Sequence, residues 1–436
     1  MVGWQAPCRH GRDVSGGRWR TRRDGAPDGD RSMSVPERRA SEASIARNVK
    51  RHVWRGTWTF RASCAPGLEE LLGREVQRLP GIEDVHVASG AVRFVAPFDT
   101  LYVALLRLRT ADTLRVRIGL GAAATFAMAR DQLGRIPWAW WLPARSALEV
   151  RVRSERSRLR DAPGLERTLR QALQQHGIES DADVEGGPAF TVLLSLVQDQ
   201  AEVWLDLAGD PLYRRGGDRW VAPTSLRETS AAAAALAADV MEADVVVDPF
   251  CGSATLLTEA GSILQDASVG MRRSFALEAS PVWNAGRFRH AQRSVATPTS
   301  TLLPPLVGID VETQALEAAR HNLEVCGVAR PVLLLADART VAAQLAPITR
   351  TALRPALISN PPYGHRAAAV GAAPDALLRE VVEVVTSTRR GVTWRLGLLY
   401  PRPEALQGVE GWHLERVERV RIRGFATALV RGTLTR

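Results

Sequence analysis

Apolar and polar positions follow two regular patterns along the first half of the chain, from residue 57 to about residue 210. Alternation with a period of two predicts strands, and apolar residues at helical spacing predict helices between them. The expected strands are 57–63, two short ones within 85–95, 114–118, 147–153, 191–197 and 201–207. The expected helices are 66–79, 100–109, a run from 125 and 163–176. This mixed order predicts two small α+β units.

The pattern changes after residue 225, where short, continuously apolar runs alternate with helical segments. Runs of this kind predict strands that are buried on both faces of a parallel sheet. The expected strands are 245–247, 306–309, 332–335 and 356–358, and the clearest helix is 315–326. Ser225 and Glu228 form a capping-box pattern before an alanine-rich helix. The fold class predicted for this half is α/β, a Rossmann-like, doubly wound sheet.

A polar residue follows each of these four apolar runs. Asp248 ends the first run, Asp310 the second and Asp337 the third, and Asn360 follows the fourth. Ligands of doubly wound sheets bind at the carboxyl ends of the strands. Polar residues at all four strand ends therefore predict a cofactor crevice.

The loop after the first of these strands, 248–255, helps to choose the cofactor. It contains small residues and leads into a helix from Thr255, so backbone amides point at whatever is bound. It lacks both the GxGxxG pattern and the lysine of a P-loop, and an acid at its start would repel a pyrophosphate. We therefore expect S-adenosyl-L-methionine rather than a dinucleotide.

The ribose and the adenine of this cofactor are assigned to two of the acids. Asp310 is expected to accept hydrogen bonds from the ribose hydroxyls, and Asp337 from the adenine amine. Glu278 is an alternative ribose acid, because it lies nearer the usual spacing of about 20 residues from the loop. The predicted cofactor-binding residues are Asp248, Pro249, Cys251, Gly252, Ser253, Thr255, Asp310, Asp337 and Ala338.

The segment after the fourth strand carries the predicted catalytic residues, Asn360, Pro361, Pro362 and Tyr363. The Asn360 carboxamide oxygen and the Pro361 carbonyl oxygen can each accept one hydrogen of an aryl amine. The two prolines hold these acceptors rigid, as preorganised stabilisation requires. Tyr363 can stack on the base. The target base must be single-stranded or flipped out.

Length and composition limit the possible classes of protein. A chain of 436 residues is long enough for two or three domains with real cores. The four cysteines are scattered, which predicts neither a metal site nor a disulfide framework and is typical of a reducing cytoplasm. No apolar run approaches the length of a membrane span, so we expect no membrane association.

The net charge of +10 is concentrated at the N-terminus. Residues 1–55 carry thirteen Lys and Arg against six Asp and Glu and show no sustained periodicity, which predicts a disordered basic tail. Elsewhere, five arginines are candidates for phosphate contact with RNA: Arg151, Arg153, Arg156, Arg214 and Arg215. The tryptophans at 138, 140 and 141 lie among apolar residues, which favours a place in the core.

The two motifs together, Asp248-Pro-Phe-Cys-Gly-Ser-Ala-Thr255 and Asn360-Pro-Pro-Tyr-Gly364, give the chain a family resemblance. With the small α+β units before them and the Leu212-Tyr-Arg-Arg-Gly216 connector, the chain resembles the THUMP-domain RNA guanine-N2 methyltransferases. The segment 275–278 is similar to the branch that acts on bacterial 23S ribosomal RNA, which would place Glu278 in an insertion. Ala254 is a departure, since the family usually has glycine there.

The resemblance implies a domain order and a substrate. It implies a ferredoxin-like part at 56–110, a THUMP-like RNA-binding domain at 111–210, a linker at 211–224 and a methyltransferase domain at 225–436. The implied partner is structured ribosomal RNA or tRNA, bound by a cytoplasmic monomer without a metal. Two alternatives stay open: a methyltransferase of adenine N6 or cytosine N4 in DNA, and a noncatalytic RNA-binding protein with a decayed cofactor site.

Overall fold

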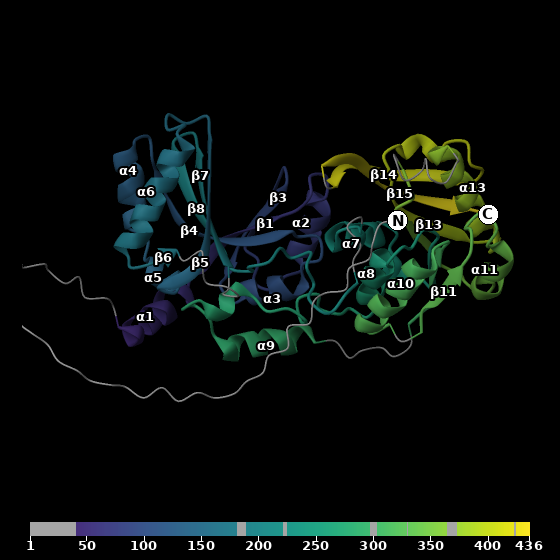
Figure 1. The fold of residues 1–436 in the computed structure, drawn as a ribbon, viewed down its shortest axis with the longest axis horizontal. Helices are drawn as coiled ribbons and strands as arrows, with labels where there is room; N and C mark the ends of the chain where they lie inside the picture. Colours follow the sequence, from purple (N-terminus) through teal and green to yellow (C-terminus); the bar gives the residue numbers. More distant parts are fainter. Residues whose placement is uncertain are drawn as a thin grey trace, which may run out of the picture.

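A computed structural model describes residues 41–180, 189–220, 225–296, 303–328, 330–363, 373–422 and 424–436. It contains an eight-stranded sheet near one end of the molecule and a seven-stranded sheet near the other (Figure 1). The eight-stranded sheet belongs to the N-terminal half and the seven-stranded sheet to the C-terminal half. Among the described residues, no helix combines the length and apolar character needed to cross a membrane.

The N-terminal sheet has the strand order β2-β3-β1-β4-β8-β7-β5-β6. Its strands are β1 (Thr57–Ser63), β2 (Asp84–Ala88), β3 (Ala91–Pro97), β4 (Thr113–Ala122), β5 (Arg145–Glu155), β6 (Glu179–Ser180), β7 (Ala189–Val197) and β8 (Gln200–Asp206). All the predicted strands of this half are present. The strand β4 pairs with β1 on one side and β8 on the other, so one sheet crosses the expected boundary at residue 110.

Helices cover this sheet where the apolar spacing predicts them. They are α2 (Glu69–Gln77), α3 (Thr100–Arg107), α4 (Phe126–Gly134), α5 (Trp138–Trp141) and α6 (Ala162–Gln175). Trp138 and Trp141 are fully buried, and Trp140 is partly buried against the same core. Trp141 packs edge-on against Trp58 with 4.9 Å between the ring centroids. These indoles therefore serve as core, as the sequence predicts.

The expectation of a disordered segment up to residue 55 is wrong for residues 41–55. These residues form α1 (Glu42–Asn48) and a π-helical turn (Val49–Val53). Val49 and Val53 are buried, and the Trp58 indole donates a hydrogen bond of 2.9 Å to the Val53 carbonyl. Burial of Val49 and Val53 stabilises an ordered structure here despite the polar composition of the segment. Residues 1–40 lie outside the described residues.

The C-terminal sheet has the strand order β11-β10-β9-β12-β13-β15-β14. Its strands are β9 (Val245–Asp248), β10 (Leu306–Asp310), β11 (Val332–Leu335), β12 (Pro355–Ser359), β13 (Thr393–Leu399), β14 (Trp412–Ile422) and β15 (Phe425–Thr435). The pairs from β11 to β13 are parallel, and β15 runs antiparallel to both of its neighbours. This arrangement confirms the predicted Rossmann-like sheet.

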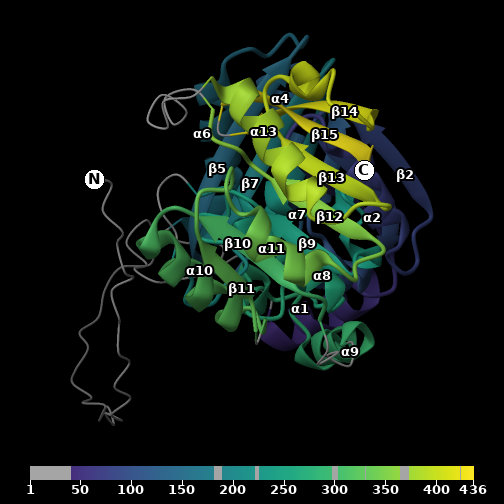
Figure 2. The same cartoon turned by 90° about the vertical axis from the view of Figure 1, so that its right-hand side faces the viewer.

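Helices bury both faces of this sheet (Figure 2). They are α7 (Glu228–Ala237), α8 (Thr255–Leu264), α10 (Thr313–Val325), α11 (Ala342–Thr349) and α13 (Pro374–Ser387). Val246 joins the core under α7, α8 and α10, whereas Val245 and Val247 join the core under α11 and α13. The predicted capping box is wrong: α7 begins at Glu228 with Arg227 as N-cap and no side-chain capping bond.

The two halves are joined through the segment between α8 and β10, which includes α9 (Ala285–Val295). Arg109 is buried, and its guanidinium donates to the Ser262 hydroxyl at 2.8 Å and to the carbonyls of Ser262 and Ala267. Arg107 pairs with Asp266 at 2.6 Å. The halves are therefore docked by buried, hydrogen-bonded charges as well as by apolar contact.

Candidate active site

The carboxyl ends of four parallel strands form one edge of the C-terminal sheet. The register places Leu357 of β12 opposite Val247 of β9, so Asp248 and Asn360 extend from neighbouring strands toward the same edge. On the other side of β9, Gly308 of β10 lies opposite Asp248, and β10 continues to Asp310. The chain order reverses between β10 and β12, on either side of β9, which is where doubly wound sheets bind ligands.

Asp248 is a buried carboxylate with spare hydrogen-bonding capacity. Its side chain is in a residue that is 1% exposed, and Oδ1 accepts a bond of 3.2 Å from the Phe250 N–H. Within the described part of the chain its Oδ2 makes no hydrogen bond of good geometry, although the buried Ser359 hydroxyl interacts with this carboxylate. Burial, with a smaller contribution from the charge of Asp310, raises the pKa of Asp248 to about 8. A cationic group beside it would stabilise the ionised form.

The loop after Asp248 brings backbone amides to this edge. Gly252 has a φ of +52°, and its N–H donates to Asp310 Oδ2 at 2.9 Å. No described atom lies within 4 Å of the position that a Cβ would take at Gly252. Cys251 is buried, which raises the pKa of its thiol well above the ordinary value, so the thiol is neutral. The open space beside Gly252 and the free oxygen of Asp248 fit a polar ligand.

Ala254 has left-handed backbone, with φ 63° and ψ 31°, directly before α8. This region costs an alanine roughly 1–2 kcal/mol. The strain explains why glycine is the usual residue of the resembled family at this position. Ala254 is nevertheless accommodated, because its side chain is fully buried in the core.

The two acids assigned to ribose and adenine already have protein partners. Asp310 Oδ1 accepts from the Glu312 N–H at 3.0 Å, in addition to the Gly252 bond. Asp337 is paired with Arg339 at 2.6 Å, which lowers the pKa of the Asp337 carboxyl. Both carboxylates are only partly buried, so each keeps exposed surface for a ligand.

The predicted catalytic segment follows β12. Asn360 is partly buried, and its Oδ1 is buried without a hydrogen-bond partner among the residues that the structure describes. Pro361 is buried, and Tyr363 meets Tyr400 edge-on with 6.3 Å between the ring centroids. An unpaired buried carboxamide oxygen costs roughly 1–3 kcal/mol, which a donor from a ligand would recover. Gly364 lies outside the described residues.

Asn322 on α10 is a contributor that the sequence analysis misses. Its residue is fully buried; Oδ1 accepts from the Trp220 N–H at 2.8 Å, and Nδ2 donates to the carbonyls of Trp220 and Ser253 at 2.9 Å each. The side chain thereby ties the connector before α7 to the cofactor loop. An asparagine within a helical pattern gives no sequence signal for this role, because its partners lie 102 and 69 residues away.

Two residues that the sequence suggested for binding, Arg215 and Glu278, have other roles in the structure. Arg215 has a buried side chain that pairs with Glu259 at 3.3 Å and donates to the Arg109 carbonyl, so the expectation that it contacts RNA is wrong. Glu278 caps the short turn Ala276–Ala279, where its carboxylate accepts from the Phe275 N–H. That turn packs against Ala208 of the N-terminal half, which excludes Glu278 as the ribose acid.

The remaining candidate arginines lie at the surface. Arg151 and Arg153 share one face of β5, where Arg151 pairs with Glu149 at 2.8 Å and Arg153 donates to the Ser195 hydroxyl. Arg156 is exposed and has a left-handed backbone. Arg214 is exposed and pairs with Asp210. Their positions leave guanidinium surface available to a ligand.

The fold and the strand-end site are those of an S-adenosylmethionine-dependent methyltransferase. A family model described as "RMKL-like, methyltransferase domain" matches residues 215–424, and one described as "RlmL ferredoxin-like domain" matches residues 59–116. Residues 215–424 match this RMKL-like methyltransferase family, and S-adenosylmethionine is the cofactor of this domain. The second match confirms the ferredoxin-like part of the N-terminal half.

Similar proteins support this assignment. The chain is 29% identical to "Putative RNA methyltransferase YpsC" of Bacillus subtilis, over 71% of this chain and 80% of that protein. It is also 29% identical to "Ribosomal RNA large subunit methyltransferase K/L" of Methylococcus capsulatus, over 71% of this chain but only 43% of that protein. The chain thus spans less than half the length of the latter relative.

A solved structure shares the fold over most of its length. It is described as "SMU.472, a putative methyltransferase complexed with SAH", and its TM-score to this chain is 0.69 at 26% identity. The match covers 86% of this chain and 97% of that one. SAH is the demethylated product of the cofactor, which agrees with the cofactor inferred for this chain.

Proposed function

We propose that this protein methylates the exocyclic N2 amine of a guanosine in ribosomal RNA or tRNA. The single observation that carries the proposal is the buried Oδ1 of Asn360, which has no partner among the described residues and lies at the end of the strand next to that of Asp248. That oxygen is an acceptor to which no described residue donates, at the ligand-binding edge of a methyltransferase fold. The names of the relatives support an RNA substrate, and the family resemblance supports the guanine amine.

We assign the cofactor to the edge formed by β9, β10 and β11. Asp248 would take the ammonium group, because Oδ2 makes no well-formed hydrogen bond with the described residues and a cation would lower the raised pKa of this carboxyl. The exposed parts of Asp310 and Asp337 would take the ribose and the adenine. Gly252 leaves the space in which the ligand approaches the backbone. When bound, S-adenosylmethionine supplies a methyl group on a cationic sulfur.

Asn360 and Pro361 would orient the target amine. The lone pair of an aryl amine is delocalised into the ring, which makes the nitrogen a poor nucleophile. If the Asn360 Oδ1 and the Pro361 carbonyl oxygen each accept one amine hydrogen, the lone pair is directed away from the ring plane toward the methyl donor. The proline ring at 361 fixes the φ angle after Asn360, so the acceptors are preorganised. Tyr363 would then support the base by stacking.

The N-terminal half would position the RNA. We propose that the segment 111–210 is a THUMP-like RNA-binding domain and that Arg151, Arg153, Arg156 and Arg214 contribute phosphate contacts. Each such contact releases counterions, so binding would weaken as salt rises.

Methyl transfer from radiolabelled S-adenosylmethionine tests the proposal. The purified chain is incubated with total RNA from a strain that lacks the protein and, separately, with unmethylated DNA. We expect label in RNA and none in DNA. Label in DNA would favour the adenine-N6 or cytosine-N4 alternative. Absence of transfer, together with no heat of cofactor binding in calorimetry, would favour a noncatalytic protein.

A further inference from the structure

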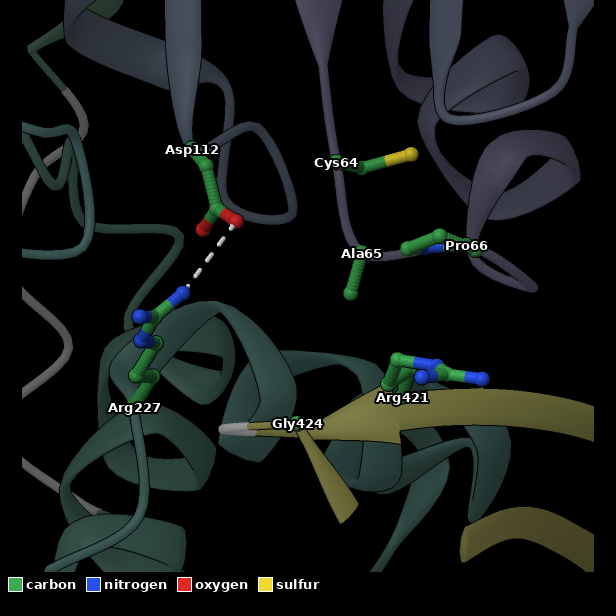
Figure 3. A pocket seen from close by; sticks show the side chains of 7 residues that line it. All are labelled: Cys64, Ala65, Pro66, Asp112, Arg227, Arg421 and Gly424. Atoms are coloured by element: carbon green, nitrogen blue, oxygen red, sulfur yellow. Dashed lines mark ion pairs between the residues drawn. The ribbon is translucent and has the colours of Figure 1, made fainter. Parts of the chain in front are cut away.

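A cavity of about 530 Å³ lies between the two halves, at the ligand-binding edge of the C-terminal sheet (Figure 3). Its lining comes from the turn after β1, from the start of β4, from the N-cap of α7 and from the β14–β15 hairpin. These residues are Cys64, Ala65, Pro66, Asp112, Arg227, Arg421 and Gly424. The catalytic residues do not line it, so it is a separate feature.

The end of the β14–β15 hairpin lies beside this cavity. It projects past the sheet edge at which Asn360 lies. Because β14 runs parallel to β12 and β13, its end at Ile422 lies on the same edge as Asn360. The strand β15 pairs with β13 only from Ala428 onward, so the hairpin projects past β13 by three residues, about 10 Å. The strands β15 and β14 are the second and third neighbours of β12, which corresponds to about 10–15 Å along the edge.

The N-terminal half holds the hairpin in place. A Cβ at Gly67 would lie 2.2 Å from the Arg419 carbonyl oxygen, which shows how closely the turn after β1 approaches β14. Arg416 of β14 also pairs with Glu70 of α2 at 2.8 Å. The hairpin end is therefore held against the ferredoxin-like part, and Figure 1 shows it reaching toward α2.

Two arginines present donors to this cavity. Arg421 is exposed, and within the described ranges no ion pair or hydrogen bond of its guanidinium is found. Arg227 lies 3.8 Å from Asp112 and 4.8 Å from the centre of the Tyr213 ring, so most of its five N–H donors stay available. Asp112 is itself engaged, because it accepts from the Thr229 hydroxyl at 2.8 Å. Unsatisfied guanidinium groups at the mouth of a cavity favour a phosphate ligand.

An exposed aromatic ring lies at the same hairpin end. Phe425 pairs with Ile422 across the hairpin end and is 68% exposed, which is unusual for a large apolar residue. Arg421 precedes this pair on β14 and lies opposite Ala426, so the alternation of side chains places Arg421 and Phe425 on opposite faces of the hairpin end. Arginine with an exposed aromatic ring is the combination by which proteins hold single-stranded nucleic acid, through phosphate contact and base stacking.

We propose that the β14–β15 hairpin end and the adjoining cavity bind the single-stranded segment of substrate RNA next to the target guanosine. Arg421 and Arg227 contact its phosphates on the cavity side, and Phe425 stacks on one of its bases where the strand passes around the hairpin end. This proposal deepens the proposed function and rests on it for the identity of the substrate. It gives the RNA a fixed path from the N-terminal half to Asn360.

Binding of a fluorescein-labelled oligouridine, followed by fluorescence anisotropy at several salt concentrations, tests the proposal without any methyl transfer. Arg421→Gln should weaken binding and reduce the slope of log affinity against log salt by about 0.7. Phe425→Ala should weaken binding by about five- to a hundredfold, with little change in the salt slope. The affinity for S-adenosylmethionine should stay unchanged in both variants.

Matched controls come from the opposite edge of the same sheet. Arg350, at the end of α11, and Leu353, just before β12, are both exposed. Arg350→Gln and Leu353→Ala should leave oligouridine binding unchanged. Thermal melting of all four variants shows whether they are folded.

Three results would overturn the proposal. The first is wild-type affinity in both hairpin variants, and the second is an equal loss in the controls. The third is displacement of oligouridine by polyglutamate at equal charge with no effect of Phe425→Ala, since this would indicate a nonspecific anion surface. If the variants bind oligouridine as expected but the wild type methylates no RNA, the proposed function fails while the binding site stands.

Discussion

Asp248 ends β9 and Asn360 follows the neighbouring parallel strand β12, and each keeps one buried side-chain oxygen without a well-formed hydrogen bond to the described residues. One oxygen is anionic when the carboxyl ionises, and the other is neutral. The pair is therefore suited to two different donors, a cation and an amine N–H. This relationship connects the methyltransferase fold to a specific chemistry, and it leads to the predictions below.

Asn360→Ala should reduce methyl transfer by about a hundred- to a thousandfold, the usual effect of losing one preorganised acceptor or donor in an active site. The affinity for S-adenosylmethionine should remain within about twofold, because Asn360 serves the amine. Single-turnover transfer and calorimetry measure the two quantities. Equal loss of both would mean that Asn360 holds the cofactor instead.

The affinity for S-adenosylmethionine should depend on pH through Asp248. The pKa of this carboxyl is about 8 in the free protein, so it is protonated below pH 8 and must lose its proton to face an ammonium group. Affinity should therefore fall as the pH drops below about 8, and it should fall again at higher pH, because an α-ammonium group has an ordinary pKa of about 8 and loses its charge there. Calorimetry in buffers of different ionisation enthalpy should show proton release. A flat profile that matches Asp248→Asn would contradict the assignment.

Asp248 should also shape the pH dependence of folding. Its pKa is raised in the folded protein, so its contribution to the free energy of unfolding is fully present below about pH 4 and is lost as the pH rises through about 8. Asp248→Asn removes this loss. As the pH rises from about 5 to about 9, the melting temperature of the wild type should therefore fall relative to that of Asp248→Asn. A constant difference would mean that the Asp248 pKa is ordinary.

Ala254→Gly should leave the free energy of unfolding nearly unchanged. Relief of the left-handed backbone contributes roughly 1–2 kcal/mol, and the lost methyl burial and the added chain entropy together offset about the same amount. The control is Ala233→Gly in the buried interior of α7, which should lower the free energy of unfolding by about 2 kcal/mol. Urea unfolding compares them. Equal losses would show that the backbone at Ala254 is not strained.

Asn322→Leu should weaken S-adenosylmethionine binding as well as stability. The substitution leaves the Trp220 N–H and the Ser253 carbonyl without their partners, at about 1–3 kcal/mol for each buried group. Asn284→Ala is the control: Asn284 accepts a cap bond from the Arg287 N–H far from the cofactor loop, so it should cost about 1 kcal/mol of stability without affecting the cofactor. A similar effect of both variants on cofactor affinity would exclude a specific role for Asn322.

Much of the fold and the candidate site follows from local sequence signals. The β-branched run before Asp248 and the polar residue at its end identify a buried strand and its ligand-facing tip without any tertiary information. The same reasoning locates Asp310 and Asn360. Parallel strands of this type are short and uniformly apolar, which makes their ends easy to recognise.

The hairpin of β14 and β15 is an element that local sequence patterns do not predict. Trp412–Ile422 is rich in arginine and glutamate and is exposed over much of its length, so its pattern resembles a solvated segment. It becomes a strand because β15 supplies the pairing. Its functional potential depends on Arg421 lining one cavity together with Asp112, a residue that is remote in sequence.

The sequence alone also does not predict which arginines are exposed and which are buried in ion pairs. Arg214 and Arg215 are adjacent and equivalent by composition, yet Arg214 is exposed and Arg215 is buried against Glu259. The difference arises from how the connector passes between the two halves. Charge therefore locates candidate RNA contacts only after burial is known.

Nucleoside mass spectrometry after methyl transfer tests the central claim most directly. Total RNA from a strain lacking the protein is incubated with the purified chain and S-adenosylmethionine, digested and compared with RNA treated with Asn360→Ala. We expect N2-methylguanosine in the first sample and none in the second. A methyl group on another atom, or N2-methylguanosine at equal levels in both samples, would contradict it.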